Sequence, residues 1–331
     1  MPPPTRSSTR PSTRGTDIGA PAERPALDAL AERPALAALA GALTIAFSAI
    51  LVDLAGVSPS TAAVFRCAYA LPVLAALALA ERRRHGPAAA GSWWRAAAAG
   101  AFFAADLILW HHAIADVGAG LATVLANLQV VLVAVAAWLL LGERPTARVA
   151  LAVPLVFGGA VLISGVVGDD AFGANPARGA LFGVLTGVAY TGFILVLRDM
   201  GRDLRRPAGP LFAATLMATI VAIVAGALLG ELDLVPSWPA HGWLVTLALT
   251  SQVLGWLLIA IALPRLPASL TSIVLTVQPV GSVLLGIVLL GEDPAPLQLA
   301  GVAVIVAGIV VATRRDQGAT RRDQGAARAA T

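Results

Sequence analysis

The sequence predicts an all-α membrane protein with ten transmembrane helices, built from two five-helix inverted-topology repeats. Three observations predict it: an apolar composition, ten apolar runs of bilayer length, and an internal repeat that covers an odd number of those runs. Of the 331 residues, 58% are hydrophobic and 13% are charged, and the mean hydropathy is +0.81. Because about a quarter of the residues in a soluble domain are charged, the composition excludes a soluble globular protein. The single cysteine, Cys67, also excludes a disulfide-stapled secreted fold.

Two polar tails flank the apolar region. Residues 1–34 are rich in Pro, Ser, Thr and Arg and contain the near-duplicates AERPALDAL and AERPALAAL, so we expect a disordered cytoplasmic tail. This segment lacks the apolar region of a cleavable signal peptide, and the first apolar run is therefore expected to stay as an anchor. Residues 313–331 repeat TRRDQGA in tandem and are expected to form a basic cytoplasmic tail.

Ten apolar runs lie between the tails, and a bilayer core about 30 Å thick requires roughly 20 apolar residues per helix. The expected spans are residues 35–55, 61–80, 96–115, 119–141, 149–167, 179–197, 211–229, 243–262, 268–290 and 297–312. Helices are expected throughout, since an open sheet would leave unpaired edges in hydrocarbon. The last run is short for a span. In the sixth, Gly179, Gly183 and Gly187 form two overlapping GxxxG units, which permit close helix packing.

The arginines predict the orientation, because cytoplasmic loops carry an excess of positive charge. One set of alternate loops holds 11 Arg and 4 acidic residues, and the other holds 1 Arg and 7 acidic residues. The arginine-rich side is expected to be cytoplasmic, with both termini on it. The absence of lysine among the 23 basic residues favours a GC-rich bacterial source, hence a bacterial inner membrane. The net charge of +4 arises from the tails, since the charges between them sum to zero, so it indicates no nucleic-acid partner.

An internal repeat organises these spans. Residues 109–163 align without a gap with residues 258–312, and LLLGERP matches VLLGEDP. A second match, GALT at Gly41 with GVLT at Gly183, extends the expected repeats to residues 35–167 and 179–312. Five spans per repeat place the second copy upside down in the membrane. Inverted repeats are typical of secondary transporters, which alternate access around a midplane site; a bundle that merely arose by duplication is the alternative.

Two long segments carry a resemblance to a known family. They read DLILWHHAIADVGAGLATVLANLQVVLVAVAAWLLLGERP and LPRLPASLTSIVLTVQPVGSVLLGIVLLGEDP, and they resemble the EamA-type family of the drug/metabolite transporter superfamily. The resemblance covers both halves, about residues 35–312. It implies a ten-helix transporter of small metabolites with cytoplasmic termini and a central cavity between the halves. Asp293 stands where the first repeat has Arg144, as inversion predicts, and Val130 stands opposite Pro279, so only the ninth span has that helix-opening proline.

Three charged residues, Asp53, Arg66 and Asp106, lie inside the apolar runs. A charge at the bilayer centre costs about 3 kcal/mol on insertion scales, and it faces the protein interior or water. Asp106 lies midway along its span with Trp110 on the same helical face. A carboxylate there would bind a proton or a cationic group beside the indole, whereas a buried structural carboxyl is the alternative. Asp53 and Arg66 flank the turn GVSPS, which favours a structural salt bridge at the periplasmic rim, with a gate that breaks and reforms as the alternative.

Amide and aromatic side chains complete the candidate solute site. Gln129 and Gln278 are equivalent in the two repeats, which predicts a pseudo-symmetric pair near the midplane; interhelical hydrogen bonding is the alternative. Asn127 lies about 200° from Gln129 around the helix, so only one of these two can face the cavity directly. The remaining candidates for binding the solute are Tyr190, Gln252 and Trp256.

The sequence thus predicts a secondary active transporter of a small organic metabolite, such as an amino acid or a drug-like solute. Export is the favoured direction and Asp106 the candidate for proton coupling, because the sequence holds no GxxxxGK[ST] motif for ATP. No catalytic residue, cofactor or metal site is predicted. His112 and Asp116 have the i, i+4 spacing of metal ligands but lack a third. The expected partners are the solute and the bilayer. The sequence also allows a homodimer.

Two other classes of function compete with transport. A non-transporting membrane sensor or partner-binding protein would act through the tails, which contain no recognisable domain. An intramembrane enzyme would need a second buried aspartate, a serine with a base, or an HExxH zinc motif. Neither HExxH nor a second deeply placed aspartate occurs in the sequence. Both classes are therefore disfavoured relative to a transporter.

Overall fold

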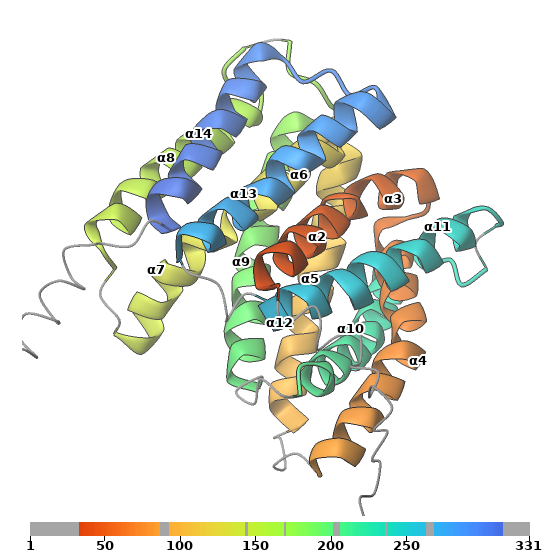
Figure 1. The fold of residues 1–331 in the computed structure, drawn as a ribbon. Coiled ribbons are helices and arrows are strands. Elements are labelled where there is room, and N and C mark those ends of the chain that lie inside the picture. The colour runs from red at the N-terminus through yellow and green to blue at the C-terminus, as the bar shows by residue number, and fades with distance from the viewer. Residues whose placement is uncertain are drawn as a thin grey trace, which may run out of the picture.

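The computed structural model describes residues 33–86, 93–142, 145–168, 170–200, 206–235, 237–262 and 268–313. Within these ranges every regular element is a helix (Figure 1). Eight helices are long and apolar enough to cross a membrane, and Ala147–Ile163 and Thr276–Leu290 are shorter apolar helices. Together they correspond to the ten apolar runs, and the predicted all-helical class is confirmed.

Seven helices form the first half of the chain. They are α2 (Pro34–Ala46), α3 (Ser48–Ala55), α4 (Pro59–His85), α5 (Trp93–Val117), α6 (Ala119–Ala126), α7 (Gln129–Leu141) and α8 (Ala147–Ile163). Two of the expected spans are interrupted, one at Phe47 and one at Asn127–Leu128. At the second break, Asn127 Nδ2 donates to the carbonyl of Thr123 at 2.8 Å. A side chain that competes for a backbone acceptor in this way disturbs a helix locally.

The second half contains wide helical turns in place of breaks. Its elements are α9 (Pro176–Met200), α10 (Ala208–Leu229), α11 (Ala240–Leu247), η1 (Ala248–Gly255), α12 (Trp256–Ala262), α13 (Ala268–Leu285), η3 (Gly286–Leu290) and α14 (Pro296–Thr313). The segments η1 and η3 are π-helical. Such turns are rare and occur frequently at functional sites. They lie in the eighth and ninth spans, whereas the breaks lie in the first and fourth.

Helices of the two halves pack against each other. The main pairs are α5 with α9, α8 with α14, α4 with α10, α6 with α13, and α2 with α12 and η1 (Figure 1). Glycines permit the closest of these approaches. A Cβ atom added to Gly159 of α8 would lie 2.7 Å from the carbonyl oxygen of Gly301 in α14. In α9, an added Cβ at Gly179 would lie 2.7 Å from the Cβ of Val117, so the predicted GxxxG face is a packing face.

Large apolar side chains cover much of the outside of the bundle. Leu140, Leu228 and Val288 are 74%, 83% and 76% exposed. Exposed apolar area of this extent marks a surface that contacts another apolar phase. Inside the bundle, Trp110 belongs to one buried apolar cluster, and Phe103 and Trp256 belong to another. The candidate site lies where these two clusters meet.

Candidate functional site

A cavity of about 40 Å³ lies between helices of the two halves. Its lining residues are Ile45, Ser48, Arg66, Phe103, Asp106, Leu107, Trp110, Thr123, Ala126, Asn127, Tyr190, Trp256 and Gln278. They come from both halves and include the break between α6 and α7. Since a water molecule needs at least about 10–15 Å³ of such space, this conformation has room for a few waters and none for an organic solute.

Arg66 reaches the cavity from α4 and is 4% exposed. Its Nε donates to Gln252 Oε1 at 3.1 Å, and Gln252 Nε2 in turn donates to Thr215 Oγ1 at 3.3 Å. The guanidinium carbon lies 5.6 Å from the ring centroid of Trp110. Its Nη1 is buried and has no hydrogen-bond partner among the described residues. One edge of the guanidinium is therefore held in place while a donor on the other nitrogen stays unused.

Asp106 lines the same cavity from α5 and is 7% exposed. Among the residues that the structure describes, no hydrogen bond or ion pair holds its carboxylate. Arg66 and Asp106 therefore place opposite charges in one cavity without an ion pair between them. The mutual attraction of two buried charges repays the cost of burying them only when good geometry and further hydrogen bonds satisfy both groups. The described protein groups therefore leave part of the hydrogen-bonding capacity of Arg66 and Asp106 unused.

Aromatic side chains form the apolar walls. The rings of Tyr190 and Trp256 are 5.9 Å apart at 87°, and those of Phe103 and Trp256 are 6.2 Å apart at 82°. Edge-to-face contacts of this kind hold large rings in defined orientations. Trp110 Nε1 is buried and, within the described part of the chain, has no partner. The cavity thus combines two charges with rigid apolar surfaces.

Comparison with known proteins identifies the family. The model of the "EamA-like transporter family" matches residues 33–165 and 177–314, which is most of the chain and falls into two units. The chain belongs to the EamA-like transporter family. A multi-pass membrane transporter, rather than an enzyme, follows from this membership, and so do a solute and a lipid bilayer as partners.

The remaining comparisons concern fold and close relatives. A solved structure titled "Crystal structure of protein" is similar to this EamA-like transporter with a TM-score of 0.57 and 21% sequence identity. The match covers 85% of this chain and 98% of the other. At this identity the similarity concerns the fold alone. No curated protein matches the chain.

Of the eight side chains predicted to bind solute, six line the cavity of the EamA-like transporter. They are Asp106, Trp110, Asn127, Tyr190, Trp256 and Gln278. Gln252 lies behind Arg66 and is fully buried. Gln129 is half-buried at the first residue of α7, beside Gly187, and does not line the cavity. The structure therefore does not bring Gln129 and Gln278 together, because the break after Asn127 turns α7 out of register with α6.

The expected pair of Asp53 and Arg66 is not formed. Asp53 is exposed on α3, whereas Arg66 points into the bundle and bonds to Gln252. Because α4 begins at Pro59, Arg66 lies about 10 Å along the helix axis from its start, well inside the rim. The prediction that Arg66 lies at the rim was therefore wrong. A signal was present: Ala62 and Ala70, four residues to either side, are small and fully buried, as on a helix-packing face.

A second acidic residue, Glu292, ties α6 to the loop after η3. Its carboxylate accepts backbone N–H bonds from Ala119 and, at 3.1 Å, from Gly120, in the first turn of α6. A helix N-terminus favours such a negative group. Glu292 is 7% exposed, and a Cβ at Gly118 would lie 2.7 Å from its Oε1. Burial raises the pKa of the Glu292 carboxyl, although the bonds from Gly120 and Ala119 oppose that rise.

Ties at both ends hold α5 to α9. Near the end of the bundle that carries Glu292, Arg178 Nε and Nη2 donate to the carboxylate of Asp116 at 2.7 and 2.5 Å. At the opposite end of the same helices, Arg95 Nη1 lies 3.0 Å from Asp199 Oδ2. This pair of helices is therefore fixed near each membrane surface.

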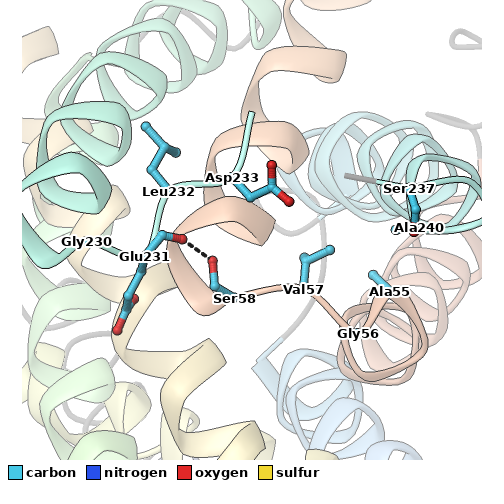
Figure 2. A pocket seen from close by; sticks show the side chains of 10 residues that line it. All are labelled: Ala55, Gly56, Val57, Ser58, Gly230, Glu231, Leu232, Asp233, Ser237 and Ala240. Carbon is cyan, nitrogen blue, oxygen red and sulfur yellow. Dashed lines mark hydrogen bonds between the residues drawn. The ribbon is translucent and has the colours of Figure 1, made fainter. Parts of the chain in front are cut away.

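The contact between α4 and α10 is fixed in the same way. At one end Glu81 accepts the backbone N–H groups of Ala208 at 2.9 Å and Gly209 at 3.0 Å. At the other end Ser60 Oγ donates to Glu231 Oε2 at 2.8 Å. The backbone carbonyl of Glu231 accepts the Ser58 hydroxyl, as Figure 2 shows. Three helices that line the cavity, α4, α5 and α9, are thus tied at both ends.

A larger pocket of about 450 Å³ lies at the Glu292 end of the bundle, between the α3–α4 turn and the α10–α11 loop (Figure 2). It is lined by Ala55, Gly56, Val57, Ser58, Gly230, Glu231, Leu232, Asp233, Ser237 and Ala240. The Glu231 carboxylate instead reaches Ser60 and lies 3.4 Å from His112 Nε2. None of the predicted solute-binding residues lines this pocket, and the central cavity is therefore the better candidate site.

Proposed function

We propose that this EamA-like transporter is a secondary active transporter that exports a small organic metabolite, such as an amino acid or a related compound, by alternating access. One observation carries the proposal: a cavity shared by the two halves holds opposite charges on Arg66 and Asp106 between aromatic walls. Charged side chains are costly at membrane depth and mark solute or ion pathways. A site between repeat halves is also where inverted-repeat transporters bind their solute.

The helices that move are inferred from the ties. Because α4 with α10 and α5 with α9 are fastened at both ends, we assign them to the stationary part of the transporter. The mobile part comprises α6–α7 and α13–η3, whose backbones are broken or π-helical. Breaks of this kind are where helices bend during conformational changes. Asn127 lies both at the break and in the cavity, so solute contact there would bias the bend.

Proton coupling is assigned to Asp106. A carboxylate with no ion pair, in a cavity that opens to each side in turn, can take up a proton on one side and release it on the other. The test measures solute flux driven by a pH gradient in vesicles that contain the wild-type protein or Asp106→Asn. Loss of the proton-driven component in the variant is expected. Coupling that survives the substitution would exclude Asp106 as the proton site.

The proposed location is the bacterial inner membrane, with both termini in the cytoplasm. The native Cys67 is fully buried, so it can be replaced by alanine before single cysteines are introduced. A membrane-impermeant maleimide added to intact cells should label a cysteine at Asp233 and spare one at Arg84. The reverse pattern would invert the topology. Light scattering in detergent decides the open question of a homodimer by separating a protein mass of 33.6 kDa from twice that value.

A further inference from the structure

We propose that Arg66 binds an anionic group of the solute and that the solute is a zwitterion, with its cationic group at Asp106 and an apolar remainder against the aromatic walls. This inference rests on the proposed transport function and narrows its solute class. It reassigns Arg66, which the sequence places at the rim of the membrane, to the centre of the binding site.

The hydrogen bonds of Arg66 leave room for a carboxylate. A guanidinium has five N–H donors in a planar fork and no acceptor. Gln252 occupies Nε, and Thr215 fixes Gln252, so the plane of the guanidinium is oriented by protein groups. The buried Nη1 has no partner among the described residues. A carboxylate that enters the cavity can accept this unused donor, which is the pairing that arginine forms most strongly.

The charge balance of the cavity selects a zwitterion over a simple ion. When Asp106 is deprotonated, Arg66 and Asp106 together contribute no net charge, and both are at least nine-tenths buried. A monoanion or a monocation would add one uncompensated charge to this mostly apolar interior, which is strongly unfavourable. A zwitterion adds none, and each of its charges meets an opposite one. The charges that line the cavity therefore match a solute whose anionic and cationic groups lie in the same order as Arg66 and Asp106.

The walls indicate what lies between the charges. Trp110 stands on α5 one turn after Asp106 and stacks near the Arg66 guanidinium, at 5.6 Å from centroid to Cζ. Among the other lining residues, Tyr190 and Trp256 hold each other edge to face. These surfaces match an apolar side group rather than a sugar or a polyphosphate. Because the cavity holds only a few waters in this conformation, the solute enters after α6–α7 or α13–η3 has moved.

Three matched probes test the solute class with the purified full-length protein in detergent. Leucine carries both charges, leucinamide lacks the carboxylate, and the deaminated analogue of leucine lacks the ammonium group. We expect calorimetric titration to give an affinity for leucine about tenfold or more above that for either analogue, as expected for a lost charge-assisted hydrogen bond. Leucinamide that binds as tightly as leucine would overturn the assignment of Arg66. If no member of a panel of neutral amino acids binds, the proposal of a zwitterionic solute is overturned.

Variants separate binding from a structural role. In Arg66→Gln the preference for leucine over leucinamide should fall to about twofold or less, because the carboxylate loses its charged partner. Arg66→Lys keeps the charge without the planar fork and should retain part of the preference. Arg198→Gln removes an exposed arginine at the end of α9 and should change nothing. Equal weakening of leucine and leucinamide by Arg66→Gln would show that Arg66 only supports the fold.

A transport measurement distinguishes failure of this inference from failure of the proposed function. Counterflow of leucine and leucinamide is measured with the wild-type protein in liposomes. Counterflow of leucine is expected. If leucinamide shows counterflow and leucine does not, the proposal of a zwitterionic solute is overturned, whereas the proposed transport function is supported.

Discussion

Replacing Glu292 with alanine removes the carboxylate that accepts the backbone N–H groups of Ala119 and Gly120. A hydrogen bond to a charged group contributes about 1.5–3 kcal/mol, so two bonds set an upper range of about 3–6 kcal/mol. Burial of the carboxylate, which raises its pKa, offsets part of this. We therefore expect the free energy of unfolding to fall by about 2–3 kcal/mol, or roughly 30- to 150-fold in the folding equilibrium.

Thermal unfolding in detergent measures this loss. At about 2.1 cal/mol/K of unfolding entropy per residue, a change of about 2–3 kcal/mol corresponds to a decrease in Tm of roughly 3–4 °C for a chain of 331 residues. The matched control is Asp293→Ala, because Asp293 is the adjacent acid in the sequence and is exposed. Its substitution should change the unfolding free energy by no more than about 0.5 kcal/mol. Equal Tm values for the two variants would refute the assignment of Glu292 as the group that ties α6.

The remaining predictions concern the same ties and the cavity. The pKa of Glu292 is raised in the folded protein, so the protonation-dependent part of its contribution is fully present below the unfolded pKa and is lost as pH rises through the folded pKa. The Tm advantage of wild type over Glu292→Gln should therefore shrink with rising pH, and an advantage that grows with pH would contradict this. Gly120→Ala places a Cβ 2.8 Å from the Cα of Val283 and should lower stability by about 1–3 kcal/mol, while Gly158→Ala, with nothing within 4 Å, should not. Unfolding is measured in detergent for both variants, and an equal loss of stability in Gly120→Ala and Gly158→Ala would contradict the close packing of Gly120 against Val283. Gln252→Leu frees Arg66 Nε and should weaken leucine binding about tenfold without changing the order of preference among the probes; unchanged affinity would refute its positioning role.

Most of the architecture could be predicted because it depends on patterns that hydrocarbon enforces. Apolar length identifies the spans, and the GERP and GEDP segments relate the two halves. The GxxxG face of α9 packs as expected, with Gly179 against Val117. These features depend on composition and spacing along one helix, and they can be read without knowing which helices are neighbours.

The misplaced residues depend on details that spacing does not carry. Gln129 leaves the cavity because the helix breaks at Asn127, and a 100° rotation per residue does not hold across a break. Arg66 turns inward because Gln252, far away in sequence, offers it an acceptor. The role of Glu292 depends on a contact with α6 that only the fold creates. In each case the missing information is a long-range contact or a local departure from ideal helix geometry.

In the proposed mechanism, solute and proton meet in the cavity between Arg66 and Asp106. The most direct measurement is proton movement into liposomes that contain the purified protein and a trapped pH-sensitive dye, recorded when neutral amino acids are added outside. With the wild-type protein, addition of a transported amino acid should move protons at once, and Asp106→Asn should abolish this movement while Arg198→Gln preserves it. Unchanged proton movement in Asp106→Asn, or none with any amino acid in the wild type, would contradict the account.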